Sequence, residues 1–291
     1  MIVEVPEVAQ AAQLACLLEA SAPKPGNVSP GRPFRNITFE DFLASAVAIG
    51  PAFTQVGERS LGETIRAAVE ATARVTRTNT NLGIILLLAP LARAAVESGG
   101  SPLERLERVL SATTVQDAEE VYQAIRRANP GGMGVAVSQD LGSTPQVTLL
   151  ETMELAAGRD AVAGEYATVF ATTRTVGAPA LRTARADGLN WSDAVVETFL
   201  KLLASRPDTL IERKLGKEAA AEVSAKAAAI IGVGGVRSDE GRQAIERFDG
   251  ELRDPQNSRN PGTTADLTTA AIFTELLEFG WPSKGGIFRA Q

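Results

Sequence analysis

Residues that could bind a phosphorylated ligand gather in short polar segments at the ends of predicted helices. In residues 23–27, two prolines restrain the backbone, Gly26 allows a ligand to approach closely and Lys24 supplies a positive charge. These residue types suit an anion. A plain turn between two helices explains them equally well, because the glycine spacing of nucleotide-binding loops is absent.

A second segment, residues 78–83, places Asn79, Thr80 and Asn81 directly before a strongly apolar stretch. One such residue is expected as the N-cap of a helix, but a run of them exceeds what a cap needs. Free backbone N–H groups and the positive end of the helix dipole would favour an anion here. The alternative is an extended cap that binds no ligand.

The third segment, residues 207–216, combines a carboxylate with two cations. Asp208 and Thr209 stand at one end, and Arg213 with Lys214 follow four to six residues later. The acidic end could hold a metal ion or a ribose hydroxyl, and the basic end could hold phosphates. A capped helix with a solvated charged face is the alternative explanation.

The fourth segment, residues 260–267, begins with Asn-Pro-Gly and opens the last long helix. Gly262 and Thr263 lie at the expected helix start, and Asp266 falls in its first turn. A carboxylate is stabilised there by the helix dipole alone. The segment therefore predicts either a ligand site or an ordinary helix start.

Asp117 and Glu120 form a smaller acidic group on a predicted helix. Their spacing of three residues puts both carboxylates on one face, where they could share a Mg²⁺ ion. An exposed acidic helix face accounts for the same spacing.

Composition excludes several classes of site. The 291 residues contain no histidine and one cysteine, Cys16, so imidazole catalysis, histidine-ligated metals and an intrachain disulfide are excluded. The net charge of −6 disfavours nucleic acid as a partner. The N-terminus lacks the pattern of a signal peptide, and the apolar run at residues 82–91 is too short to span a membrane. We expect a cytoplasmic protein that contacts no membrane.

The elements that must position these segments are predicted to be helices. Apolar residues recur at spacings of three and four, and helix-favouring residues dominate. The strand signal at residues 135–137 is too short to build a sheet. We therefore expect an all-α fold, with one multi-helix domain over residues 1–291 whose polar loops form one site. Besides a helix capped by Thr38, the expected helices cover residues 8–19, 62–75, 82–96, 102–110, 115–127, 148–157, 161–186, 191–204, 218–231, 239–253 and 264–279.

In order and spacing, the four segments resemble the triphosphoribosyl-dephospho-coenzyme A synthase family. Residues 19–26 are similar to its early Pro-Lys-Pro-Gly signature, residues 207–216 to a later Asp-Thr and basic-glycine stretch, and residues 260–267 to its C-terminal signature. Residues 79–83 read Asn-Thr-Asn-Leu-Gly where the family usually has Asn-Thr-His-Lys-Gly. This variant looks like a subgroup associated with tetrahydromethanopterin biosynthesis.

The resemblance implies an all-α enzyme that transfers a triphosphoribosyl group from ATP. The acceptor hydroxyl attacks C1′ of the ribose, adenine leaves, and Mg²⁺ is expected with the nucleotide. The acceptor would be dephospho-coenzyme A or a tetrahydromethanopterin precursor. A non-catalytic nucleotide-binding protein is the alternative, since the missing His-Lys pair removes two groups that could hold phosphate or move protons. A homo-oligomer is compatible with the sequence.

Under this resemblance, Asp208 and Asp266 are the catalytic candidates. One carboxylate would stabilise positive charge on the ribose and the other would accept the acceptor's proton. The order of the two roles stays open. The residues expected to bind ATP are Lys24, Gly26, Asn79, Thr80, Asn81, Thr209, Arg213, Lys214, Gly262 and Thr263.

Overall fold

The computed structural model describes residues 3–129 and 141–281, and the regular elements in these two ranges are all helices. An isolated bridge between Ser29 and Arg32 is the sole β contact recorded within them. The all-α prediction is confirmed, and the strand signal at residues 135–137 lies outside the described residues. In chain order the elements are α1 (Val5–Ser21), α2 (Phe39–Ala48), α3 (Gly50–Phe53), α4 (Leu61–Val75), α5 (Leu82–Val96), α6 (Pro102–Ser111), α7 (Val115–Ala128), α8 (Leu149–Ala156), α9 (Ala161–Ala167), a π-helical turn η1 (Thr173–Gly177), α10 (Ala178–Ala186), α11 (Trp191–Ser205), α12 (Thr209–Leu215), α13 (Lys217–Gly232), a 3₁₀ turn η2 (Gly235–Arg237), α14 (Asp239–Leu252) and α15 (Gly262–Phe279).

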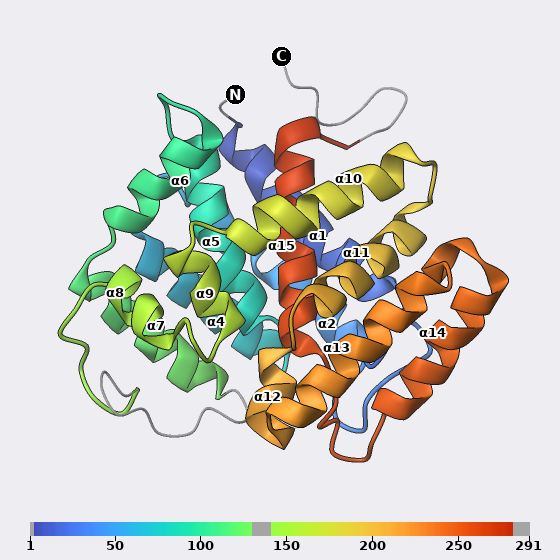
Figure 1. Ribbon diagram of the computed structural model, residues 1–291. Helices are drawn as coiled ribbons and strands as arrows, with labels where there is room; N and C mark the ends of the chain where they lie inside the picture. The colour runs from blue at the N-terminus through green and yellow to red at the C-terminus, as the bar shows by residue number, and fades with distance from the viewer. Residues whose placement is uncertain (1–2, 130–140, 282–291) are drawn as a thin grey trace.

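The last long helix, α15, runs through the middle of the molecule (Figure 1). It packs against α1, α5, α10 and α11, and a single hydrophobic core includes buried side chains from α1 to α15. Helix α5 is apolar on nearly all sides, and its residues 84–90 are all buried. A helix without a polar face must be enclosed by other helices, which explains why α5 lies inside.

Capping residues define where several helices begin. Ser60, Ser101, Thr114 and Thr148 each accept a hydrogen bond from the backbone N–H three residues later. In each case the acidic side chain at that later position accepts the N–H of the cap, which completes a capping box. These starts agree with the helices expected from the sequence to within one or two residues.

The expected single helix over residues 161–186 is wrong. Helix α9 ends at Ala167, and Val169 and Phe170 adopt positive φ angles of 51° and 59°. The buried carboxylate of Glu165 then accepts the N–H groups of Thr172 and Thr173, which starts a new helical segment at η1. The sequence did not reveal this break, because neither a β-branched nor an aromatic residue favours the left-handed region.

By length and composition, one stretch, Lys217–Arg237, could cross a membrane. Core helices also pass this test. Helix α13 within the stretch packs against α11 and α12, and its residues Ala220, Val223 and Ala227 are buried. The stretch is therefore weak evidence for a membrane span.

Candidate active site

A cavity of about 800 Å³ opens where the N-termini of α5 and α15 meet α7, α8, α9 and α12. Its wall combines apolar side chains with amides, carboxylates and basic residues, a composition typical of ligand sites. Of the residues that the sequence singled out, those on the wall are Asn79, Thr80, Asn81, Arg213, Lys214, Gly262, Thr263 and Asp266. Those not on it are Lys24, Gly26, Asp208, Thr209, Asp117 and Glu120.

Asp266 lies in the second turn of α15, partly buried, with its carboxyl group against the backbone of α5. A Cβ atom on Gly83 would lie 2.6 Å from Cγ of Asp266 and closer still to Oδ2, so this position has no room for a side chain. Burial raises the pKa of Asp266 well above its ordinary value, and the nearby carboxylates of Glu19, Asp208 and Asp160 raise it further. Within the described part of the chain, the Asp266 carboxyl group forms no hydrogen bond or ion pair.

Asp208 is buried and holds two helix starts together. Its Oδ1 accepts the N–H groups of Leu210 and Ile211 at 2.9 and 3.1 Å, and its Oδ2 accepts both the N–H and the hydroxyl of Thr264 at 2.7 Å. Burial raises the pKa of Asp208, although these hydrogen bonds oppose the change. With four donors on two oxygens, Asp208 is placed to join α12 to α15 rather than to contact a ligand.

Lys24 is an internal cation, with 1% of its surface exposed. Its Nζ lies 3.0 Å from Oε1 of Glu19 and donates to the carbonyl oxygens of Glu19 and Ala22. Its placement therefore does not support the predicted phosphate contact. Glu19, at the end of α1, does line the cavity. Apart from its position five residues before Lys24, nothing in the sequence indicates that Glu19 lines a cavity.

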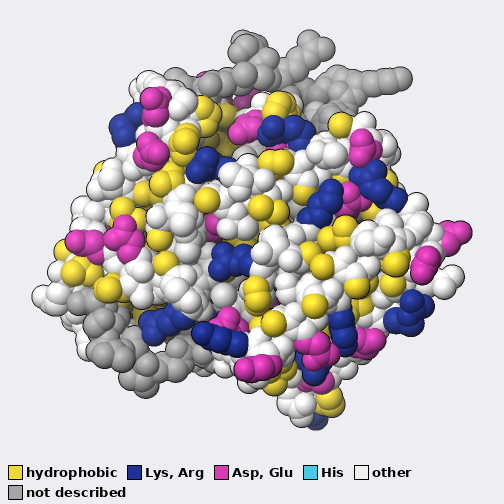
Figure 2. All heavy atoms as spheres, viewed as in Figure 1, with side chains coloured by type: hydrophobic (Ala, Val, Ile, Leu, Met, Phe, Trp, Pro, Cys, Tyr) yellow, Lys and Arg dark blue, Asp and Glu magenta, His cyan; other side chains and the backbone are white. Residues whose placement is uncertain are grey.

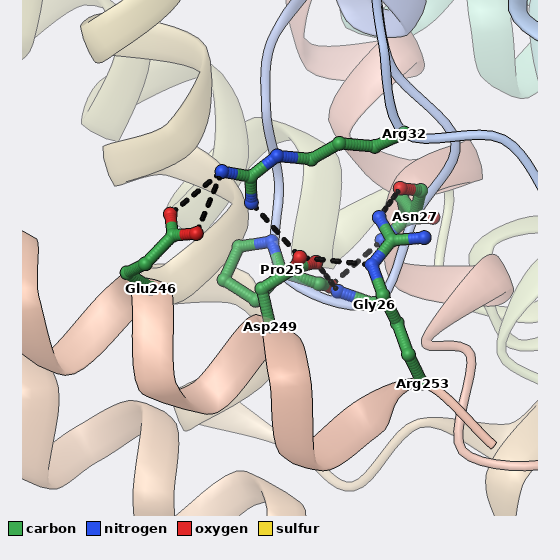
Figure 3. Close-up of polar contacts among 7 residues, drawn as sticks. All are labelled: Pro25, Gly26, Asn27, Arg32, Glu246, Asp249 and Arg253. Carbon is green, nitrogen blue, oxygen red and sulfur yellow. Dashed lines mark hydrogen bonds and ion pairs between the residues drawn. The ribbon is translucent and has the colours of Figure 1, made fainter.

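The loop around Gly26 is held by α14, as Figure 3 shows. The Gly26 N–H donates to Oδ1 of Asp249 at 2.8 Å, and Oδ2 of Asp249 accepts from Arg32 and Arg253. Gly26 has a φ of 71°, and a Cβ there would lie 2.8 Å from Leu252. Glycine is required for this close packing. The loop reaches the cavity through Asn27, not through Gly26.

Of the three polar side chains just before α5, two bind protein groups and one has a donor without a partner. Asn79 Oδ1 accepts the N–H of Leu82 at 3.0 Å, and the Thr80 hydroxyl lies 2.5 Å from the hydroxyl of Ser45. Asn81 is 4% exposed, and its Nδ2 has no hydrogen-bond partner. A buried unsatisfied donor is costly unless a ligand or water satisfies it, so Asn81 is the best-placed of the three for a ligand contact.

The cations on the cavity wall come from four separate segments. Arg213 pairs with Asp160 at 2.5 Å, its Nε has no partner, and Lys214 donates to the carbonyl of Asn257 at 3.1 Å. On the face drawn in Figure 2, Lys and Arg side chains lie in the region of α9 and α12. The side chains of three further arginines of the wall form no ion pair or hydrogen bond within the described residues. They are Arg77, Arg127 and Arg159.

Thr209 and Gly262 have packing roles beside the cavity. The Thr209 hydroxyl accepts the N–H of Ala161 at 3.2 Å and lies 3.3 Å from the hydroxyl of Thr263. A Cβ on Gly262 would lie 2.8 Å from a methyl group of Leu210. Thr263 and Gly262 touch the cavity, whereas Thr209 supports the wall from behind.

The predicted magnesium pair is not supported by its surroundings. Asp117 completes the capping box of Thr114 and also accepts the N–H of Gly62 at 2.8 Å. Glu120 pairs with Arg66 at 2.8 Å. Asp117 is thus satisfied by protein groups and Glu120 is held by an ion pair, and neither residue lines the cavity. Among the residues that the structure describes, no group of three or more acidic or cysteine side chains could hold a metal ion.

Cys16 is buried and free, as expected for a small core residue. Burial raises the pKa of its thiol, and the charges of Glu19 and Asp266 raise it further.

Comparisons with known proteins point to one family. The model of the family described as ATP:dephospho-CoA triphosphoribosyl transferase matches residues 6–284. A protein of Stutzerimonas stutzeri, assigned as a 2-(5''-triphosphoribosyl)-3'-dephosphocoenzyme-A synthase, is 26% identical over 80% of this chain and 78% of its own length. One from Azotobacter vinelandii with the same assignment is 27% identical over 84% of this chain and 81% of its own.

A solved structure has a similar fold. The crystal structure from Archaeoglobus fulgidus, assigned as a triphosphoribosyl-dephospho-coA synthase, superposes with a TM-score of 0.64 and 30% identity. The match covers 82% of this chain and 100% of the other. The resemblance found in the four polar segments is thereby confirmed at the level of the family.

Proposed function

The chain belongs to the ATP:dephospho-CoA triphosphoribosyl transferase family, and from this premise we propose that it transfers the triphosphoribosyl group of ATP to an acceptor hydroxyl and releases adenine. The acceptor oxygen forms a bond to C1′ of the ribose as the bond from C1′ to adenine breaks. The triphosphate stays on the ribose. Such a reaction needs cations for the triphosphate and a carboxyl group near C1′.

One observation carries the proposal: a single cavity presents unpaired arginines together with the unpaired carboxyl group of Asp266. Arg77, Arg127 and Arg159 have no carboxylate partner in the described residues, so their charges are available to phosphate oxygens. The unsatisfied Nε of Arg213 and Nδ2 of Asn81 add two donors on the same wall. The apolar part of the wall, including Leu149 and Met153, suits a purine ring.

The arginines also compensate for the departure from the family motif. Asn81 and Leu82 stand where the family usually has His-Lys, and Leu82 lines the cavity without a charge. In our proposal Arg77, just before the motif, and the two arginines across the cavity supply the positive charge that residue 82 lacks.

We propose dephospho-coenzyme A as the acceptor, by analogy with the names of the relatives. A tetrahydromethanopterin precursor is the second candidate, because the Asn-Leu pair makes the cavity wall less basic near Asp266 than the family motif would. Mg²⁺ is proposed to enter as part of the nucleotide substrate. Magnesium on a nucleotide is held mainly by phosphate oxygens and water, so it needs no dedicated cluster of carboxylates.

The test is to incubate the protein with ATP, Mg²⁺ and each acceptor, and to separate the products by chromatography. Free adenine that appears only with a particular acceptor would support the transferase and identify its substrate. ATP that binds but stays intact with every acceptor would favour the non-catalytic alternative. Release of ADP in place of adenine would contradict the proposal, because a different bond would have broken. Asp266→Asn serves as the inactive control.

A further inference from the structure

We propose that Glu19 and Asp266 form a catalytic carboxyl pair, in which Asp266 donates a proton to the departing adenine and Glu19 accepts the proton of the acceptor hydroxyl. This inference rests on the proposed function and assigns its acid and its base. Glu19 replaces Asp208 as one of the two catalytic carboxyl groups that the sequence analysis predicted.

The two side chains reach one cavity from helices that pack together. Glu19 stands in the last turn of α1 and Asp266 in the second turn of α15, and these helices lie against each other (Figure 1). Both residues line the cavity, and the charge of Glu19 raises the pKa of Asp266. A substrate in the cavity can therefore meet both carboxyl groups.

The two carboxyl groups have different surroundings. Glu19 is held in an ion pair with a buried cation, since Nζ of Lys24 lies 3.0 Å from its Oε1. Asp266 has no bonded cation in the described chain, and burial together with the charges of Glu19, Asp160 and Asp208 raises its pKa.

The guanidinium of Arg213 lowers the pKa of Asp266, but it is bonded to Asp160 and not to Asp266. Burial and three nearby carboxylates favour the neutral form of Asp266, and the single opposing guanidinium is shared with Asp160. A neutral carboxyl group and an ion-paired carboxylate in one cavity are the usual arrangement of an acid and a base.

Asp208 is a poor candidate for either role. Its two oxygens accept four hydrogen bonds from α12 and α15, and it does not line the cavity. It holds Thr264, two residues before Asp266, so we assign it as a positioning residue for the acid.

The step balances in protons and charge. The acceptor oxygen attacks C1′ and its proton passes to Glu19, while the electron pair of the breaking C1′–N bond goes to adenine. A ring nitrogen of adenine takes the proton of Asp266, so adenine leaves as the neutral base. Glu19 is then protonated and Asp266 ionised. Transfer of one proton from Glu19 to Asp266, directly or through water, restores the starting state.

The decisive experiment compares two donors that differ in how well the base leaves. Adenine needs protonation, whereas the base in the triphosphate of 6-chloropurine riboside is a better leaving group. We expect Asp266→Asn to slow release of adenine by about 100-fold or more, the usual size of an acid's contribution, and to slow release of chloropurine by less than about 10-fold. Glu19→Gln should slow both donors by the same factor.

A pH profile separates a catalytic role from a structural one. In the wild-type protein, kcat should fall at high pH as Asp266 loses its proton. Asp266→Asn should remove this alkaline fall, and Glu19→Gln should leave it in place. Glu240→Gln, on the exposed face of α14 and away from the cavity, is the matched control and should leave the profile unchanged.

The outcomes distinguish this inference from the proposed function. Wild-type protein that releases no base with any acceptor would overturn both. The acid assignment alone would be overturned if the wild-type protein is active and the Asp266→Asn variant binds ATP but releases both bases more slowly by the same factor. A Glu19→Gln variant that keeps the wild-type rate with both donors would overturn the assignment of the base.

Discussion

The carboxyl group of Asp266 lies against the backbone of Gly83, where a Cβ atom would approach its Cγ to 2.6 Å. The contact joins the N-terminus of α5 to the second turn of α15. It explains why the residue after Leu82 has no side chain, and it fixes the direction in which the proposed acid faces the cavity.

Substitution of Gly83 should therefore impair catalysis while leaving the fold intact. Gly83→Ala inserts a methyl group into the space of the Asp266 carboxyl group, so the carboxyl group must move. We expect the rate of adenine release to fall by about 10-fold or more, since small displacements of catalytic groups are costly. Gly232→Ala, at the end of α13, has no atom within 4 Å of its Cβ and should keep full activity.

The unpaired arginines should determine the affinity for ATP. Single changes of Arg77, Arg127 or Arg159 to Gln should each raise the KM for ATP by about 10-fold, because a charge-assisted hydrogen bond contributes about 1.5–3 kcal/mol. The value of kcat should change less. Arg247→Gln, exposed on α14 and away from the cavity, is the matched control. An unchanged KM in all three cavity variants would place the triphosphate elsewhere.

Removal of the Lys24 charge should destabilise the protein. In Lys24→Met, the buried carboxylate of Glu19 loses its partner, which typically costs about 3–5 kcal/mol. Denaturant unfolding measures this loss, and the double variant Lys24→Met with Glu19→Gln should recover most of it. If the single variant kept its stability and only lost affinity for ATP, Lys24 would contact phosphate after all.

At neutral pH, the wild-type protein should be less stable than a variant with an amide in place of the Asp266 carboxyl group. The pKa of this carboxyl group is higher in the folded protein than in the unfolded chain. From about the ordinary value of 3.8 up to the raised value, the folded state binds more protons than the unfolded state, so stability falls as pH rises. Above the raised pKa, stability falls no further on account of this group.

Asp266→Asn removes this loss, since an amide does not ionise. We expect the variant to have a larger free energy of unfolding than the wild type at pH 7 to 8, with the difference shrinking towards pH 4. Urea unfolding at a series of pH values measures it. A difference that stays constant with pH would mean that the carboxyl group is not perturbed.

The sequence alone determined the fold class, most helix boundaries and the family. These depend on local information: the three-and-four spacing of apolar residues, the capping residues at Ser60 and Thr148, and the order of the polar segments. The break at Val169 and Phe170 was missed, because it depends on Glu165 binding backbone groups beyond its own helix.

The division of the polar segments into ligand-facing and structural residues was decided only by the tertiary structure. Lys24 and Asp208 have the residue types expected of a site, but each is fully engaged by buried protein groups. Glu19, Arg77 and Arg159 lack any local signal and reach the cavity because distant helices meet there. Residue type limits what a side chain can bind. Which partner it meets depends on packing between segments far apart in the chain, and local sequence patterns do not encode that packing.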